Sequence, residues 1–418
     1  MYNVKRAYEL LEKISFERLG GSKEEKKAAE ILKEEIEKRG VKAYEEEFEV
    51  DYSEVKVAKL EVLKPYNKSY IVTGVKMSGC TSKEGIEAEL VYIEDGLDAN
   101  LIDVEGKIVI LNSRIMHKVY KKLLEKKVAG FIALSGSIYD NLEDSDLDVF
   151  AIREVSYSLG KIPGVALRAI DGQELIELNA SKARLTLIQE EGKATSRNVV
   201  CEIKGTTYPD EIVAMTAHFD SVKFSTGAYD NASGSVGVME LFHHFVDNPP
   251  KRTIRFVWCG SEEMGLLGSK AHVKLHEEEL NKYVYCLNID MIGVTLGKEI
   301  AVSTAENCLV NYISYVASEV GVPLKSSQGV YSSDSTPFAD KGVPSTSFAR
   351  ISPMGGAKIH SRKDVISPLK AEAFDSSLKV MVAFAERILN SVIFPIPRSI
   401  PDNMKTELDF YNLRKERP

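Results

Sequence analysis

Apolar and amphipathic stretches alternate along the second half of the chain, from residue 191 onward. Mostly apolar runs, each of a length suited to one buried strand, occupy residues 198–205, 211–220, 253–260, 283–291 and 344–351. Apolar residues recur with helical periodicity at 233–246, 265–279, 309–321 and 367–391. The alternation predicts an α/β fold, a three-layer α/β/α sandwich with helices on both faces of a mixed, mostly parallel sheet.

The first 190 residues divide into two parts with different sequence patterns. Residues 23–39 have helical periodicity, with Ser22 as N-cap and Glu25 in position for a capping box, and a short strand is expected at 44–50. From 55 to 190, short β-rich runs surround one basic amphipathic helix. We therefore expect a discontinuous α/β domain (1–54 and 191–395), an inserted mostly-β lobe (55–190) and a C-terminal tail (396–418).

Composition and charge limit the class of protein. The chain has 418 residues, of which 44% are hydrophobic, and a net charge of −8, which argues against a nucleic-acid partner. No apolar run approaches the ~20 residues of a membrane span, and the N-terminus lacks the apolar core of a signal peptide. The five cysteines form no CxxC pair and are expected to be free thiols. These features predict a cytoplasmic protein without a membrane span, and they leave the oligomeric state open.

Residues of metal-ligand type follow three of the predicted strands directly. The run at 211–220 ends with His218 and Asp220, the run at 253–260 is followed by Glu262 and Glu263, and the run at 283–291 ends near Asp290. In open α/β sheets, ligands bind outside the carboxyl ends of the strands. We therefore expect these side chains to meet at one edge of the sheet.

Two loops add further candidates to this edge. Asp230 lies in a Gly/Asn/Ser-rich loop that leads into a helix, and His360 lies in a glycine-bearing loop after the last strand. Oxygen and nitrogen donors without sulfur suit a catalytic Zn²⁺, with Mn²⁺ or Co²⁺ as substitutes. Five ligands exceed what one open catalytic zinc needs, but they suit two ions ~3.5–4 Å apart that share a carboxylate.

Each of these residues also has an ordinary structural explanation. A histidine at a strand end is commonly a satisfied core group, an Asp in such a loop commonly caps a helix, and paired glutamates can complement a helix dipole. The joint arrangement at one edge favours a metal site over five separate coincidences. His272 and His276 share a helix face but lack the adjacent Glu of an HExxH motif, so we do not expect them to be ligands. His243 and His244 lie within a helix, one expected in the core and one in solvent.

Five segments of the chain resemble the motifs of a known family. The segments AHFDS, GAYDNASG, SEEMGLLGS, NIDMIG and IHSRKD (217–221, 227–234, 261–269, 288–293 and 359–364) are similar to those of co-catalytic di-zinc aminopeptidases of the bacterial leucyl-aminopeptidase type, relatives of glutamate carboxypeptidase. The segment RLGGSKEEKKAAEIL (18–32) resembles the first helix of that family, and parts of 55–190 resemble its inserted protease-associated domain. The resemblance covers most of residues 15–390 and implies a zinc-exopeptidase-like fold.

The resemblance also implies roles for individual residues. One zinc ion would be held by His218, Asp230 and Asp290, and a second by Asp230, Glu263 and His360. Glu262 would be the general base, and Asp220 would accept a hydrogen bond from His218 and fix its tautomer. The sequence departs from the family at Ser335, where relatives often carry a histidine.

The predicted function is that of a metal-dependent exopeptidase. The leading form is an aminopeptidase that removes N-terminal residues from peptides through a hydroxide bridging two zinc ions. A carboxypeptidase or dipeptidase on the same site remains an alternative, with Arg350 as a group that could hold a terminal carboxylate. A glutaminyl cyclase, which needs one zinc, and a non-catalytic binding ectodomain follow as weaker alternatives. The side-chain preference is not determined by the sequence.

Overall fold

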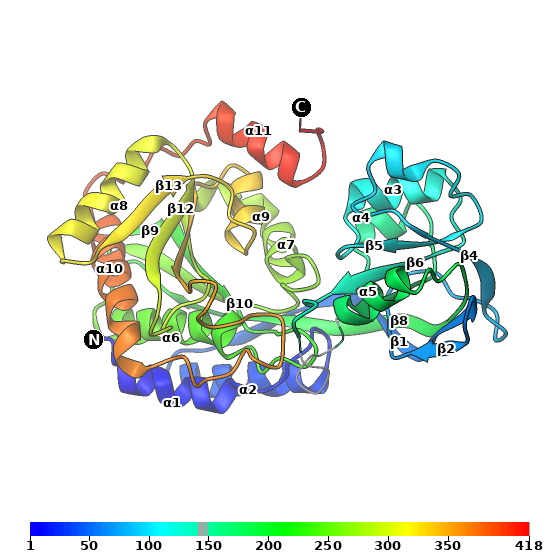
Figure 1. Cartoon of the computed structure of the whole chain (residues 1–418). Coiled ribbons are helices and arrows are strands. Elements are labelled where there is room, and N and C mark those ends of the chain that lie inside the picture. Colours follow the sequence, from blue (N-terminus) through cyan, green and yellow to red (C-terminus); the bar gives the residue numbers. More distant parts are fainter. Residues whose placement is uncertain (141–146, 148, 418) are drawn as a thin grey trace. The chain divides into compact units, whose positions relative to one another are not determined.

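The computed structural model describes residues 1–140, 147 and 149–417. The chain forms two compact units, one made of Met1–Val50 with Thr195–Pro418 and the other of Asp51–Ala194 (Figure 1). Strands β1 (Tyr44–Lys64) and β8 (Lys182–Ile203) pair with each other and run across the boundary along the chain. The limits of the second unit lie a few residues outside the 55–190 expected from sequence.

The first unit is built on a mixed sheet whose strands follow the order β13-β12-β14-β11-β9-β10-β8. Neighbours β13/β12, β14/β11, β11/β9 and β9/β10 are parallel, whereas β12/β14 and β10/β8 are antiparallel. The strands are β9 (Tyr208–His218), β10 (Arg252–Cys259), β11 (Tyr283–Ile289), β12 (Lys298–Thr304), β13 (Leu324–Gln328) and β14 (Ser345–Ile351). This is the mixed, mostly parallel sheet that the sequence predicts.

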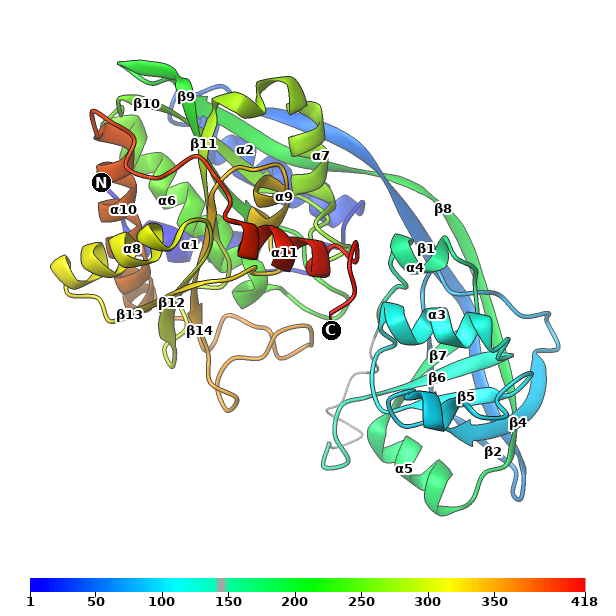
Figure 2. The same cartoon turned by 90° about the horizontal axis from the view of Figure 1, so that it is seen from above.

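Helices cover both faces of this sheet. Along β9, Val213 and Met215 join one buried cluster while Ile212 and Ala214 join another, as the two-residue alternation of a strand requires. The first cluster is completed by α1 (Val4–Ile14), α2 (Lys23–Glu37), α6 (Ser233–Asp247), α8 (Asn307–Glu319) and α10 (Ala371–Asn390). The second is completed by α7 (Leu267–Leu275) and α9 (Ser335–Asp340), and Figure 2 shows α11 (Asp402–Tyr411) beside α9. The three-layer α/β/α prediction is confirmed.

Local details differ from the sequence-based expectations in three places. Ser22 does cap α2, since its Oγ accepts the Glu25 backbone N–H at 3.0 Å. The Glu25 carboxylate, however, accepts from Gly21 N at 2.8 Å instead of closing a capping box onto Ser22. His243 and His244 are both buried, so the expectation that one faces solvent is wrong. The third difference is that β12 and β13 were not expected.

The second unit contains a sheet with helices on both of its faces. Strands β4 (Ile86–Tyr92), β5 (Ile108–Leu111), β6 (Gly130–Ser135) and β7 (Gly164–Arg168) are parallel neighbours, β2 (Lys68–Tyr70) pairs with β1, and β3 (Thr73–Gly74) pairs with β7. Figure 2 shows α3 (His117–Glu125) and α5 (Ala169–Glu177) on opposite faces, each with its own hydrophobic cluster. Short helical segments are α4 (Glu154–Tyr157) and η1 (Asp98–Leu101).

All five cysteines are free thiols, as expected. Among the residues that the structure describes, no helix is both long and apolar enough to cross a membrane.

Candidate metal centre

The ends of neighbouring parallel strands bring the expected residues together in the first unit. His218 is the last residue of β9 and pairs in register with Cys259, the last residue of β10. Glu262 and Glu263 follow β10 within four residues, and Asp290 follows β11 directly. Because the strands run in the same direction, their carboxyl ends open onto the same edge.

Three buried residues form the first set of possible ligands. His218 Nε2 lies 3.2 Å from Asp230 Oδ1 and 3.8 Å from Asp290 Oδ1. Asp230 comes from the short turn η2 (Ala228–Ala232) that leads into α6. His218, Asp230 and Asp290 each offer one donor atom, and these atoms lie within 4.8 Å of one another.

A second set shares Asp230 with the first. His360 Nε2 lies 3.1 Å from Asp230 Oδ2 and 3.1 Å from Glu263 Oε1. The donor atoms of Asp230, Glu263 and His360 also lie within 4.8 Å of one another. Asp230 therefore turns one oxygen to each histidine, which is the arrangement expected of a carboxylate that bridges two ions.

Glu262 and Asp220 lie next to these sets without belonging to them. Glu262 Oε2 is 3.9 Å from His218 Nε2. The two oxygens of Asp220 accept the backbone N–H groups of Glu262 (2.9 Å) and Glu263 (3.2 Å). His218 Nδ1 is 3.3 Å from Asp220 Oδ1 but is not aligned with it as a hydrogen bond. Asp220 thus holds the turn that carries both glutamates as well as facing the ring of His218.

The clustered carboxylates favour positively charged groups beside them, as the pKa values of the two histidines show. Burial acts to lower the pKa of His360, but Asp230 and Glu263 outweigh it and raise this pKa to about 11. Burial also acts to lower the pKa of His218. The nearby carboxylates outweigh it and raise this pKa well above its usual value; they are those of Glu262, Asp220, Asp230 and Asp290. Burial raises the pKa of Glu262 well above the normal range, and neighbouring carboxylates add to the effect.

These observations fit metal ions better than protons alone. Glu263 Oε1 and Asp290 Oδ1 are buried without an aligned hydrogen-bond donor, although such atoms are normally satisfied. Two imidazoles with carboxylate oxygens are a donor set suited to zinc. Two dications would satisfy the unpaired oxygens and replace the protons that the crowded acids otherwise attract.

Four residues near this centre were not found by sequence reasoning. Arg18 is fully buried, and its guanidinium donates to the backbone carbonyls of Ile14, Phe16, Phe219, Thr226 and Gly227. Asp364 accepts the backbone N–H groups of Tyr229 (2.8 Å) and Asp230 (3.3 Å), and burial raises its pKa to about 7. Both residues lie in the quoted motifs 18–32 and 359–364, but their partners are backbone atoms that leave no mark in residue types.

Asp334 and Tyr331 are the other two. Asp334 is fully buried, neither of its carboxylate oxygens has an aligned donor, and burial raises its pKa to about 6. Burial also raises the pKa of Tyr331, and the charges of Asp290, Asp230 and Glu262 add to that effect. Tyr331 therefore keeps its phenolic proton beside the acids.

Two residues singled out in the sequence have other partners. Ser335, the residue at which the sequence departs from the expected family pattern, is buried and shares a hydrogen bond with Ser347 (Oγ to Oγ, 2.8 Å). The guanidinium of Arg350 donates to Val294 O (2.7 Å), Thr295 O (3.2 Å) and Glu299 Oε1 (3.1 Å). Arg350 is thus engaged in holding neighbouring segments of the sheet edge.

Comparison with known proteins gives the same family as the motifs. Residues 198–385 match the model of Peptidase family M28. The aminopeptidase YwaD of Bacillus subtilis (strain 168) is 29% identical over 361 residues, which are 83% of this chain and 76% of that protein. Carboxypeptidase Q of Mus musculus is 26% identical over 290 residues, 65% of this chain and 61% of that protein.

Solved structures extend the likeness to nearly the whole chain. The zinc aminopeptidase BSAP from Bacillus subtilis superposes with a TM-score of 0.79 at 24% identity, over 96% of this chain and 98% of that chain. A Peptidase M28 precursor from Shewanella amazonensis SB2B gives a TM-score of 0.73 at 25% identity, over 94% and 95%. Residues 198–385 of the protein thus match Peptidase family M28, and the protein is a metallopeptidase.

Proposed function

We propose that this metallopeptidase is an aminopeptidase that works with two metal ions, zinc in the first place, and with Glu262 as general base. One observation carries the proposal: Asp230 directs one carboxylate oxygen to His218 (3.2 Å) and the other to His360 (3.1 Å). His218, Asp230 and Asp290 would hold one ion, and Asp230, Glu263 and His360 the other. Co²⁺ or Mn²⁺ could replace zinc at such donors.

The residues of the chain divide the chemical work. Two ions held there would make a water molecule acidic and offset negative charge on the substrate carbonyl oxygen. Glu262 takes a proton from the water molecule while the water oxygen adds to the peptide carbonyl carbon. Glu262 then gives that proton to the leaving amine as the C–N bond breaks. Asp220 holds the backbone of Glu262 in place through the 2.9 Å contact. Tyr331, which keeps its proton, can donate a hydrogen bond to a substrate oxygen.

The charge of the site favours binding of a substrate amine over a substrate carboxylate. The acids gathered here are Asp220, Asp230, Glu262, Glu263, Asp290, Asp334 and Asp364. When all seven acids are ionised, two dications and the buried guanidinium of Arg18 do not neutralise them, so the site favours binding of a free α-ammonium. Arg350, the group considered for a terminal carboxylate, is occupied by Val294, Thr295 and Glu299. The likeness to carboxypeptidase Q keeps carboxypeptidase activity as a second candidate.

A single experiment separates these alternatives. The purified protein is stripped with a chelator, reloaded with Zn²⁺ in steps, and assayed on peptides with a free N-terminus, a blocked N-terminus or a blocked C-terminus. We expect activity to reach its maximum at two zinc ions per chain and to require a free N-terminus. Full activity with one tightly bound ion would contradict the shared-carboxylate site. Cleavage that requires a free C-terminus would instead establish the carboxypeptidase.

Other expectations remain predictions. They are that residues 55–190 form a protease-associated domain, that the protein is cytoplasmic, and that it has peptides and no nucleic acid as partners. Cell fractionation followed by immunodetection would test the location.

A further inference from the structure

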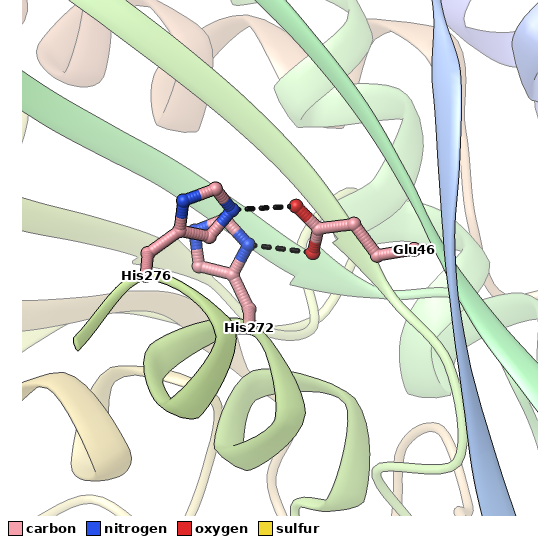
Figure 3. Close-up of side chains that lie close together, drawn as sticks. All are labelled: Glu46, His272 and His276. Carbon is pink, nitrogen blue, oxygen red and sulfur yellow. Dashed lines mark hydrogen bonds and ion pairs between the residues drawn. The ribbon is translucent and has the colours of Figure 1, made fainter. Parts of the chain in front are cut away.

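A second cluster of metal-ligand residues lies outside the catalytic centre, contributed by β1 and the C-terminal end of α7. Glu46 from β1 faces His272 and His276, which lie four residues apart at the C-terminal end of α7 (Figure 3). Glu46 Oε2 is 2.8 Å from His272 Nδ1, and Glu46 Oε1 is 2.8 Å from His276 Nε2. The donor atoms of the three residues lie within 4.8 Å of one another. We propose that Glu46, His272 and His276 form a third, structural metal site that binds Zn²⁺.

The outer nitrogens of both rings have the partners that such a site requires. His276 Nδ1 lies 2.6 Å from Glu279 Oε1, and His272 Nε2 lies 3.0 Å from the hydroxyl of Tyr283. Histidine ligands almost always donate their second N–H to a carboxylate or another oxygen, which directs the free lone pair at the metal. In the tautomers with protonated outer nitrogens, both inner lone pairs would point at the same carboxylate, that of Glu46. Neutral rings in these tautomers would leave that carboxylate facing lone pairs unless a cation lies between them.

The cluster is buried and has an excess of negative charge. Only 6% of the Glu46 side chain and none of the His272 side chain is exposed, whereas 15% of His276 is, which leaves a path to solvent. Arg255 pairs with Glu279 and Glu202, and Glu202 also pairs with Lys204, so the carboxylate of Glu46 has no arginine or lysine partner among the ion pairs of the described residues. Arg255 approaches His276 from the Nδ1 side (3.1 Å), away from Glu46. A dication between Glu46 and the rings would therefore improve the charge balance without meeting Arg255.

Without a metal, the same residues can form a hydrogen-bonded network. His272 would donate its Nδ1–H to Glu46 and accept a hydrogen bond from the Tyr283 hydroxyl. His276 would have to be protonated on both ring nitrogens, so that Nε2–H donates to Glu46 and Nδ1–H donates to Glu279. Burial acts to lower the pKa of His276, but its two carboxylate partners raise it above the usual value. A zinc ion takes the place of the two protons that face Glu46. The 2.8 Å contacts need to open by only a few tenths of an ångström, since ligands of one tetrahedral zinc lie ~3.3 Å apart.

The position of the cluster indicates a structural role. It links β1 to α7, and α7 begins at Leu267, four residues after Glu263. Asn198 extends the link, because its side chain contacts Glu46 Oε2 (3.3 Å), Gly268 O (3.0 Å) and Gly260 N (3.2 Å). A metal at this place would hold the segment that carries Glu262 and Glu263 against the N-terminal strand, without contacting substrate.

The test compares zinc content between matched variants of the full chain. Each protein is stripped with a chelator, dialysed against Zn²⁺ and analysed for bound metal. We expect His276→Ala to bind one zinc ion fewer than the wild type. We expect His244→Gln, which breaks an equally short His–Glu pair to Glu386 (2.9 Å) that has no second histidine, to bind as many as the wild type. Equal zinc content in His276→Ala and the wild type would overturn the proposal and leave a hydrogen-bonded network.

A second background keeps this test independent of the catalytic site. In a chain with His218→Ala and His360→Ala, one bound zinc should remain, Co²⁺ should give the visible absorption of a site with nitrogen ligands, and Zn²⁺ should raise the melting temperature. Adding His276→Ala should abolish all three. If His276→Ala proves unfolded by circular dichroism, His276→Gln, which keeps a polar side chain of similar size but is a poor zinc ligand, replaces it in both experiments. Retention of the zinc and the Co²⁺ absorption in the His276 variant would overturn the proposal.

Discussion

Glu262 and Glu263 are neighbours in the sequence but have different surroundings. Ser261 has a φ of 52°, in the left-handed region, and the chain turns there. The two following backbone N–H groups both donate to Asp220, so one carboxylate fixes the direction of both glutamates. Glu263 then faces His360 at 3.1 Å, whereas Glu262 lies outside both ligand sets. The two adjacent glutamates can therefore have different roles, Glu263 as a metal ligand and Glu262 as a base.

Glutamine variants of this pair should separate the two roles. Glu262→Gln keeps the size of the side chain but cannot accept a proton, so kcat should fall by ~10²–10⁴-fold while KM and zinc content change little. Glu263→Gln replaces a charged ligand by a neutral amide, so one ion should bind more weakly and activity should partly recover at high Zn²⁺. Both variants are assayed across a zinc series. Recovery of Glu262→Gln instead of Glu263→Gln would mean that the roles are exchanged, and full activity of both would refute the assignment.

His243 provides a pH-dependent contribution to stability away from the metal centre. Arg39 Nη1 lies 3.2 Å from His243 Nδ1 and can only donate, so the ring is neutral. Burial, with Arg6 and Arg39 nearby, lowers the pKa of His243 to about 4, below the ~6.5 of an unfolded chain. Between these values the unfolded state binds the proton more readily, so stability decreases as the pH falls from 6.5 toward 4.

The measurement for His243 is urea unfolding of the wild type and of His243→Gln at a series of pH values from 7 to 4. The variant cannot take up this proton, so the wild type should lose more unfolding free energy than the variant over that interval. A parallel loss in both proteins would show that His243 does not titrate differently in the folded and unfolded states.

At the scale of elements, the sequence predicted what lies in the centre of the sheet. The runs that became β9, β10 and β11 are mostly buried and mostly apolar, and their ends carry ligand-type residues, so both the strands and five of the clustered side chains were recognisable. β13 lies at the edge of the sheet with β12 next to it, and both have mixed exposure and fewer apolar residues than the central strands. Arg18 and Asp364 could not be assigned because they bind backbone groups whose positions depend on the fold. Glu46 was missed because it comes from a distant strand.

The C-terminal helix α11 shows how an element outside the expected domain can affect the site. Ile400, Met404 and Leu408 pack with Ala339, and Val330 packs against them. The hydroxyl of Tyr411 lies 2.6 Å from Ser332 Oγ. Val330 and Ser332 flank Tyr331, so α11 supports the segment that presents this phenol. The region expected to be a tail is therefore part of the folded first unit.

Truncating a buried side chain of α11 should consequently affect catalysis. Leu408→Ala should lower the unfolding free energy by ~2–4 kcal/mol and should reduce kcat, because Tyr331 becomes less well held. Lys405→Ala on the exposed side of the same helix is the control and should change neither quantity. The measurements are urea unfolding and kcat on an aminoacyl substrate. A destabilised Leu408→Ala protein with unchanged kcat would show that the site does not depend on α11.

At the scale of the whole molecule, the residues proposed for catalysis and for metal binding all lie in one of the two units. All residues of the metal centre, and Glu46, His272 and His276, belong to the first unit, which also contains the family match at 198–385. Each unit has hydrophobic clusters of its own. The first unit should therefore fold and bind metal without the second, although β1 and β8 lose their far halves. We expect the second unit to affect the preference among peptides or the solubility of the protein.

This division can be tested by removing residues 51–194 and joining Val50 to Thr195 through a short Gly/Ser linker. Since the deletion removes no ligand of any proposed site, the shortened protein should bind as many zinc ions as the full chain and should still hydrolyse a small aminoacyl substrate. Its preference among longer peptides, or its solubility, should change. Circular dichroism establishes whether it is folded, metal analysis gives the zinc content, and the full chain carrying Glu262→Gln serves as the inactive control. A folded, soluble deletion protein that has lost its metals would show that the second unit is needed to build the site.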